Sequence, residues 1–216
     1  MNEKVQALIA ALKDAYPDPM CALQYQKDYE LMIAVRLSAQ CTDARVNMIT
    51  PALFERFPTL EAFAEADVSE VEELVHSCGF YRHKARDIVL ACQMLRDRFD
   101  GKVPDNMDDL LSLPGVGRKT ANLLLGDLFR VPGSVVCDTH CIRITNKLGL
   151  AKGKEPEKVE TQLRAILPPE ESNDFCHRLV LHGRAVCIAR RPQCHSCTLR
   201  PWCDHFSKTR EGSETT

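Results

Sequence analysis

Four cysteines near the C-terminus form the first pattern in this chain that could do chemistry. Their spacing is C-x6-C-x2-C-x5-C. Because a short loop costs little entropy to close, four thiolates in so short a stretch can converge on one centre. Thiolates suit zinc or an iron–sulfur cluster and do not suit calcium or magnesium. The sequence therefore predicts a metal-held loop whose ligands are Cys187, Cys194, Cys197 and Cys203.

A glycine-rich turn at residues 113–121, with the sequence LPGVGRKTA, is the second such pattern. Only Val116 separates Gly115 from Gly117, so the run is neither a Walker A loop nor a dinucleotide fingerprint. Glycines permit positive φ and leave the backbone bare, and the amides that open the next helix lie at its positive end, where phosphate binds. The run predicts a phosphate-contacting helix–hairpin–helix; a tight turn without a ligand is the alternative.

Two side chains close to these motifs could take part in a reaction. Lys119 lies in the first turn of the second helix, where a cation opposes the helix dipole and where Arg118 adds like charge. Both effects favour an uncharged amine that can act as a nucleophile, although a simple phosphate contact is equally compatible with the position. Asp138 follows an extended segment and could be a catalytic acid, a helix N-cap, or both.

Composition bounds the class of protein. The chain has 216 residues, 44% of them hydrophobic, and a net charge of −2. No apolar run approaches the ~18 residues of a membrane span. Eleven cysteines without a secretory signal predict a reducing compartment, the cytoplasm. Acidic residues gather at 61–73 and basic residues after 176, which permits an anionic partner. Seven cysteines have apolar surroundings and are predicted to be small buried hydrophobes: Cys21, Cys41, Cys78, Cys92, Cys137, Cys141 and Cys176.

The periodicity is helical nearly throughout, which predicts an all-α fold. The clearest helices are expected at 29–40, 43–57, 81–99 and 118–129, with others ending at 79 and 113 and beginning at 138, 156 and 172. Ser69 is the expected cap of the helix that ends at 79. Proline-containing breaks predict a six-helix domain over 21–132 and a second lobe made of 1–20 and 133–206. Residues 207–216 are expected to be disordered.

Four ordered motifs together closely resemble the endonuclease III family of helix–hairpin–helix DNA glycosylases. They are the hairpin at 113–121, VCDTH at 136–140, LHGRAVC at 181–187 with the cysteine loop, and LSAQCTD at 37–43. The resemblance covers residues 1–206 and implies two helical lobes that flank a DNA-binding cleft. It implies Lys119 as nucleophile, Asp138 as its acidic partner, and a [4Fe-4S] cluster that is structural or tunes DNA binding. Zinc, with His195 or His205 near the loop, is the alternative.

The resemblance also implies DNA contacts. Gln40 matches a residue that fills the gap left by a flipped base, and Phe80 stands where relatives usually have a leucine wedge. An ordinary helix-end residue and a core residue are the respective alternatives, and the leucine-to-phenylalanine departure puts the wedge role in doubt. The full set of predicted DNA contacts is Gly115, Val116, Gly117, Arg118, Gln40, Phe80, Arg190 and Arg191.

The implied activity is excision of oxidised pyrimidines from duplex DNA, with cleavage at abasic sites through a lysine Schiff base. Two other functions compete with it. A mismatch adenine glycosylase typically lacks the lysine that Lys119 supplies here. A non-catalytic, metal-stabilised DNA-binding or redox module would not need Lys119 and Asp138 together. The expected partner is damaged duplex DNA, bound by a monomer that is nucleoid-associated if the source is a bacterium.

Overall fold

The computed structural model describes residues 2–211, with side chains described as far as residue 208, and every regular element in that range is a helix. The predicted all-α fold is confirmed. The chain divides into two compact units, one continuous and one discontinuous. We call residues 21–129 the hairpin unit, and residues 1–20 with 130–216 the cysteine-loop unit.

The hairpin unit contains the expected helices and one that the sequence pattern did not reveal. Its helices are α2 (Asp28–Ser38), α3 (Asp43–Arg56), α4 (Leu60–Ala64), α5 (Val68–Val75), α6 (Tyr81–Arg98), α7 (Met107–Ser112) and α8 (Arg118–Phe129). Helix α4 has only five residues, too few for a 3.6-residue period to appear. Helix α5 is capped by Asp67, whose carboxylate accepts from the Ser69 amide; the prediction of Ser69 as cap is wrong because the helix already begins at Val68.

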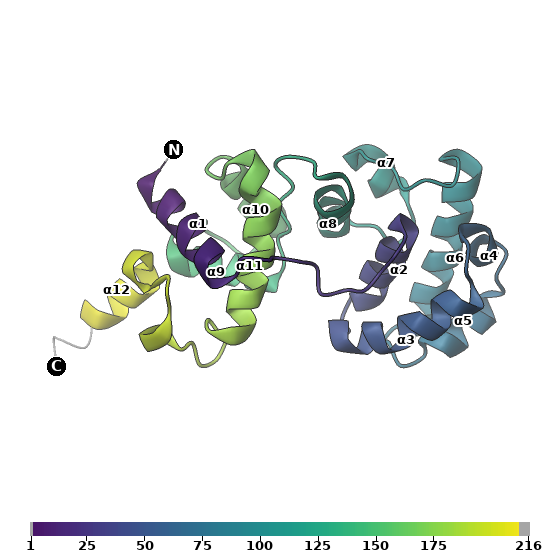
Figure 1. Cartoon of the computed structure of the whole chain (residues 1–216), viewed down its shortest axis with the longest axis horizontal. Coiled ribbons are helices and arrows are strands. Elements are labelled where there is room, and N and C mark those ends of the chain that lie inside the picture. Colours follow the sequence, from purple (N-terminus) through teal and green to yellow (C-terminus); the bar gives the residue numbers. More distant parts are fainter. Residues whose placement is uncertain (1, 212–216) are drawn as a thin grey trace. The chain divides into compact units, whose positions relative to one another are not determined.

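The core of the hairpin unit forms along α6, on which α4 and α5 pack (Figure 1). Ala85, Ile88, Cys92 and Leu95 recur at helical spacing on its buried face. Phe63 of α4 is fully buried, and its ring lies against three others: Tyr29, Phe54 and Phe57. Burial of a side chain of this size contributes roughly 1.5–3 kcal/mol to the stability of the unit.

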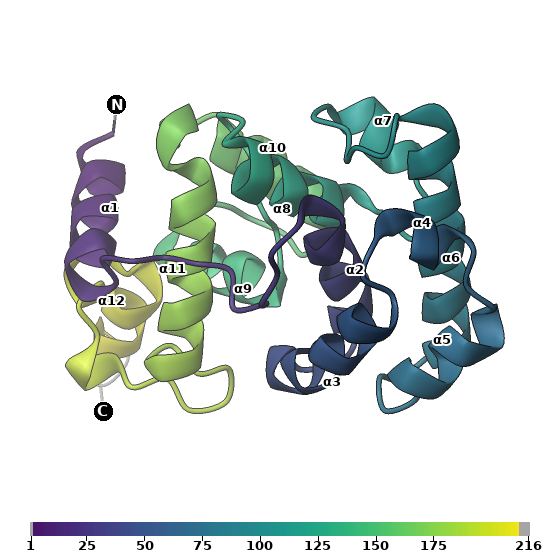
Figure 2. The ribbon, with the colours of Figure 1, turned by 45° about the vertical axis from the view of Figure 1, so that its right-hand side comes forward.

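The cysteine-loop unit joins the two ends of the sequence. Its α-helices are α1 (Glu3–Ala15), α9 (Thr139–Leu148), α10 (Pro156–Arg164), α11 (Ser172–Ala185) and α12 (Asp204–Glu211), and its 3₁₀ turns are η1 (Pro169–Glu171), η2 (Cys194–Ser196) and η3 (Arg200–Trp202). Helix α1 packs on α11, and in Figure 2 the purple α1 lies beside the yellow α12. Lys4 and Asp204 form an ion pair between these two ends at 2.5 Å.

Two expectations need correction here. Disorder is predicted from residue 207, whereas α12 continues to Glu211, because the Ser207 amide donates to Cys203 and the Arg200 guanidinium lies over the Phe206 ring. Residues 212–216 lie outside the described residues. Of the seven cysteines predicted to be buried, Cys21 and Cys41 are only half-buried.

Among residues 2–211, no helix combines the length and apolarity that a membrane crossing requires.

Candidate functional site

The hairpin begins with α7 and turns into α8 through residues 113–117. Asn106 caps α7 by accepting from the Asp109 amide. Leu113 and Val116 are buried on either side of the turn, and the Val116 amide donates to the Leu113 carbonyl at 3.1 Å. The two apolar anchors and the backbone bond therefore fix the conformation of the turn.

The two glycines of the hairpin meet different surroundings. Gly115 has φ +75°, and a Cβ placed on it would lie 2.5 Å from Arg36 Nε and 2.9 Å from Asp87 Oδ2. These two side chains form an ion pair beneath the turn, with Arg36 Nε and Nη2 donating to the same Asp87 oxygen at 2.9 and 2.5 Å. A Cβ on Gly117 would meet nothing within 4 Å. Gly115 is thus required for packing, and Gly117 leaves bare backbone on an open surface.

Lys119 is exposed in the first turn of α8. The Ala121 amide donates to the Gly117 carbonyl at 2.9 Å, which closes the first turn of the helix. The backbone N–H groups at 117, 119 and 120 precede the helical ladder and have no acceptor within the helix. No acidic residue stands in this first turn. The amides and the side chain of Lys119 together create a positive surface suited to a phosphate-bearing ligand.

Asp138 is the N-cap of α9 and is half-buried. Its Oδ1 accepts from the Cys141 amide at 2.7 Å. The cap uses one oxygen of the carboxylate, so the cap role leaves the second oxygen for chemistry. Burial, reinforced by Arg143 and Arg184, lowers the pKa of the neighbouring His140, and the Asp138 charge opposes that shift. His140 beside the carboxylate is therefore neutral at physiological pH.

Arg143 connects the helix of Asp138 with the cysteine loop. Its Nη2 donates to the Cys187 carbonyl at 2.6 Å and lies 3.4 Å from His140 Nδ1. Gly183 of α11 permits this approach, because a Cβ on it would stand 2.3 Å from His140 Nδ1. Arg143 thus links α9 to Cys187, the first predicted ligand of the loop, and no local sequence pattern indicates this link.

The four cysteines of the loop are half-buried, and none forms a disulfide. Burial raises the pKa of Cys197, and Cys187, Cys203 and Cys194 raise it further. Burial also raises the pKa of Cys187; Lys147 and Arg143 oppose this shift, and Cys203 and Cys194 add to it. Cys194 and Cys203 thus act electrostatically on both Cys187 and Cys197. Among residues 2–211, no three His, Cys, Asp or Glu side chains form a single-ion site.

His182 is a residue near the loop that sequence reasoning missed. It is 1% exposed, and its Nε2 lies 3.4 Å from Cys197 Sγ. Burial lowers its pKa to about 4, so the ring is neutral. Its Nδ1 lies 3.2 Å from the Tyr16 hydroxyl, which ties the N-terminal segment to the loop. The histidines suggested by the sequence are placed differently: His195 is exposed, and His205 is half-buried near Lys147.

Gln40 and Phe80 lie on adjacent loops. Both are exposed, and both have left-handed backbone, with φ of 55° and 58°. A Cβ on Gly79 would stand 3.9 Å from the Gln40 carbonyl oxygen, so the two loops approach closely. Strained backbone of this kind gathers at functional sites. Phe80 is 64% exposed, which excludes the core role that the sequence allowed.

The remaining predicted contacts, Arg190 and Arg191, are exposed in the loop between the first two cysteines. They belong to the cysteine-loop unit, as Asp138 does, whereas Lys119, Gln40 and Phe80 belong to the hairpin unit. Each unit thus carries one predicted reactive residue and its own predicted contacts.

Comparison with known proteins identifies the family. Residues 33–169 match the model of the HhH-GPD superfamily of base excision DNA repair proteins. Endonuclease III of Synechocystis sp. is 45% identical over 202 residues, which cover 94% of this chain and 92% of that protein. Endonuclease III of Escherichia coli is 39% identical over 201 residues, 93% of this chain and 95% of that protein. The chain belongs to the endonuclease III family.

Solved structures agree with this assignment. A trapped covalent intermediate of an endonuclease III with DNA has a TM-score of 0.89 and 40% identity, and the match covers 97% of this chain and 100% of that chain. A non-covalent endonuclease III–DNA complex has the same TM-score and identity. The resemblance of the four motifs to the endonuclease III family is confirmed, and with it the helical fold.

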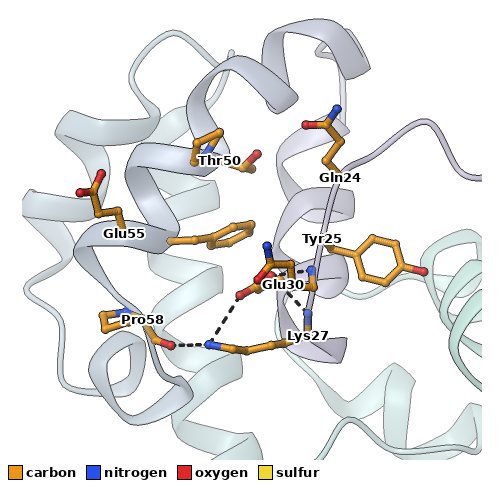
Figure 3. Close-up of a pocket in the computed structure, with 10 residues that line it drawn as sticks. Gln24, Tyr25, Lys27, Glu30, Thr50, Glu55 and Pro58 are labelled. Carbon is orange, nitrogen blue, oxygen red and sulfur yellow. Dashed lines mark hydrogen bonds and ion pairs between the residues drawn. The ribbon is translucent and has the colours of Figure 1, made fainter.

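One pocket is lined by none of the predicted site residues. It has a volume of about 440 Å³ and is bounded by residues 24–27 before α2, the start of α2, the second half of α3 and Pro58 after it (Figure 3). Its lining is Gln24, Tyr25, Gln26, Lys27, Glu30, Thr50, Pro51, Phe54, Glu55 and Pro58. Glu30 accepts from the amides of Gln26 and Lys27, at 2.7 and 3.2 Å, so its carboxylate serves to hold the helix start.

The close packing of Arg36 and Asp87 against Gly115 gives a prediction about stability. Gly115→Ala places a Cβ against the Arg36–Asp87 pair in a left-handed conformation, so the free energy of unfolding should fall by about 1–3 kcal/mol. Gly117→Ala is the matched control and should change it by a few tenths of a kcal/mol, because the space there is open. Urea unfolding followed by circular dichroism measures both. Equal stabilities for the two variants would refute the packing role of Gly115.

Proposed function

We propose that this protein is a bifunctional DNA glycosylase and abasic-site lyase that removes oxidised pyrimidines from duplex DNA. The observation that carries the proposal is an exposed lysine, Lys119, in the first turn of α8, directly after a hairpin whose Gly117 faces open space. The covalent intermediate named for a 40% identical relative supports a reaction in which enzyme and DNA become bonded.

The first step is substitution at the sugar. The damaged nucleotide leaves the base stack, because its reacting carbon is inaccessible inside the duplex. The amine nitrogen of Lys119 attacks C1′, the C1′–N bond breaks with its electrons going to the base, and a proton from the attacking nitrogen passes to the departing base. Asp138 stabilises the positive charge that develops on the sugar and assists proton movement. Its half-buried carboxylate, oriented by the cap bond to Cys141, is suited to this role.

The second step is possible because the nucleophile of the first step is an amine. The nitrogen lone pair then breaks the bond from C1′ to the ring oxygen O4′, O4′ takes up a proton from water, and an iminium forms between Lys119 and C1′. This iminium accepts electrons as a proton leaves C2′, and the bond from C3′ to the phosphate oxygen then breaks. The strand is cut on the 3′ side of the lesion, and water releases the enzyme from the sugar. An enzyme that activates water would stop at the abasic site.

Contacts with DNA are assigned to both units. In the hairpin unit, the backbone of residues 115–118 binds phosphate, Gln40 occupies the gap left by the flipped nucleotide, and Phe80 stacks between bases. The adjacent loops and the 64% exposed ring of Phe80 support this. In the cysteine-loop unit, Arg190 and Arg191 contact phosphates.

The four-cysteine loop fits a [4Fe-4S] cluster, and we assign that group to Cys187, Cys194, Cys197 and Cys203. The support is the donor set itself, four half-buried thiols within one loop, of which Cys194 and Cys203 act electrostatically on Cys187 and Cys197. When bound, the cluster holds the loop together and supplies no step of the excision chemistry. The loop in turn presents Arg190 and Arg191, and its Cys187 carbonyl receives the hydrogen bond of Arg143.

Lys119 is tested by trapping. Borohydride reduces the iminium to a stable amine, so wild-type protein should become bonded to duplex DNA that contains thymine glycol. Lys119→Gln should abolish the adduct, whereas Lys102→Gln, which alters another exposed lysine of the same unit, should not. Denaturing gels and peptide mapping of the adduct provide the measurement. Normal trapping by Lys119→Gln would assign the nucleophile to another amine.

Asp138 is tested by two substitutions that separate its roles. Asn caps helices about as well as Asp, so Asp138→Asn should leave the free energy of unfolding within about 0.5 kcal/mol of wild type while slowing excision about 100-fold or more. Asp138→Ala should slow excision similarly and also cost about 1 kcal/mol of stability. Single-turnover excision and thermal unfolding are the measurements. Full activity in Asp138→Asn would leave Asp138 as a cap only.

The cysteine assignment is tested by colour and metal content. Purified protein should be brown, with a broad visible absorption and about four iron atoms per chain, as a [4Fe-4S] centre requires. Cys197→Ser should lose the colour, whereas Cys92→Ala, at a fully buried cysteine outside the loop, should keep it. Colourless protein with stoichiometric zinc would overturn the iron–sulfur assignment.

A further inference from the structure

Two cysteines outside the metal-binding loop lie within reach of each other. Cys41 Sγ is 3.5 Å from Cys78 Sγ, although 37 positions separate them in the sequence. Cys41 follows α2 and is half-buried, and Cys78 follows α5 and is fully buried. One thiol is thus accessible to a small reagent, and the other stands directly behind it.

The pair lies at the base of the two loops that carry Gln40 and Phe80. Cys41 is the next residue after Gln40, and Cys78 precedes Phe80 by two positions. The Cys41 amide donates to Ser38 O at 3.0 Å, and the Cys78 amide donates to Val75 O at 2.8 Å. The backbone of both cysteines is therefore held by the preceding helix ends while their side chains face each other.

A buried cation stands beside the two thiols. Lys84 of α6 is 1% exposed and donates from Nζ to the Leu37 carbonyl at 2.8 Å. Burial lowers the pKa of Lys84, and both cysteines oppose that shift. Burial raises the pKa of Cys78 to about 11, with Cys41 adding to this, while Lys84 and Arg45 act in the opposite direction. Burial therefore outweighs the positive charges, and Cys78 is a protonated thiol at neutral pH.

We propose that Cys41 and Cys78 are a thiol modification site, which closes to a reversible disulfide when the protein meets a hydroperoxide or a small-molecule thiol oxidant. Closure needs the two sulfurs to approach from 3.5 Å to the covalent distance of about 2.05 Å. Side-chain rotation supplies part of this movement, and the ends of the two loops supply the rest. Disulfides that form in a reducing compartment are typically transient and redox-sensing.

The reaction balances with a hydroperoxide as the two-electron oxidant. The Cys41 sulfur attacks one peroxide oxygen and becomes a sulfenic acid, and the other oxygen leaves as water with the thiol proton. The Cys78 sulfur then attacks the Cys41 sulfur, the S–S bond forms, and the sulfenic hydroxyl takes up the Cys78 proton and leaves as a second water. Two thiols and one hydrogen peroxide thus give one disulfide and two waters. A dithiol reductant reverses the change by exchange.

A second group of cysteines shows what distinguishes this pair. Cys141 is hydrogen-bonded to both Cys137 and Cys176, so three thiols are in contact. All three are at most 5% exposed, and the pKa of Cys141 is raised well above its ordinary value. An oxidant has no route to that cluster in the folded protein. The cluster therefore serves as an internal control for the Cys41–Cys78 pair.

The functional consequence rests on the proposed function. Gln40 and Phe80 must adjust when they enter a duplex, and both already hold strained backbone. A bond between the bases of their loops restricts that adjustment. The disulfide form should therefore bind lesion-bearing duplex DNA more weakly and excise more slowly than the dithiol form, by about tenfold.

The site itself is tested without DNA. The cluster-loaded full chain is treated with diamide, exposed thiols are alkylated, and peptides from a non-reducing digest are analysed by mass spectrometry. A cross-linked peptide pair that contains Cys41 and Cys78, absent after dithiothreitol, is the expected result. Cys137, Cys141 and Cys176 should be recovered as free thiols. Recovery of Cys41 and Cys78 as free thiols under the same treatment would overturn the proposal.

The consequence is tested with Cys41→Ser and Cys78→Val, which remove either partner. Both variants should keep the basal excision rate and should lose the tenfold inhibition that diamide causes in wild type. Visible absorption monitors the iron–sulfur cluster in every sample. Equal inhibition of wild type and variants would assign the loss to another group. Inactive reduced protein with a mapped disulfide would refute the proposed function and leave the modification site standing.

Discussion

The ion pair between Arg36 and Asp87 is the interaction on which the hairpin depends. It joins α2 to α6 across 51 positions of sequence and forms the surface against which Gly115 rests. Because Gly115 has no side chain, the backbone of the turn lies directly on the Arg36–Asp87 pair. This packing determines where α8 begins, and Lys119 lies in the first turn of that helix. The position of the amine is thus set by packing beneath the turn, and the open face above Gly117 is left for a ligand.

In the cysteine-loop unit, an arginine and a glycine likewise determine the packing around the helix that Asp138 caps. Arg143 reaches from α9 to the Cys187 carbonyl, and Gly183 lets α11 approach His140 without a Cβ between them. His182 and Tyr16 extend the same set of contacts from Cys197 to the N-terminal segment. The cysteine loop is therefore hydrogen-bonded through Arg143 to α9, the helix that Asp138 caps.

Local sequence patterns predicted most of the helices, because helical periodicity and a cap such as Asp138 act within a few residues. They missed α4, which has a single turn, and placed the cap of α5 at Ser69 instead of Asp67. Motif spacing also predicted which residues could react. It could not reveal Arg36 beneath Gly115, His182 beside Cys197, or the approach of Cys41 to Cys78, since these contacts join distant positions through tertiary packing.

The discontinuous unit has a consequence for biosynthesis. Helix α1 emerges from the ribosome before its partner α11, and the Lys4–Asp204 pair can form only after residue 204 has emerged as well. The hairpin unit, continuous over residues 21–129, can fold while the rest of the polypeptide is still being made. Until α11 has emerged, the apolar face of α1, which includes Val5, Leu8 and Leu12, remains exposed to solvent. In nascent chains, α1 is therefore open to chaperones and proteases until α11 has emerged.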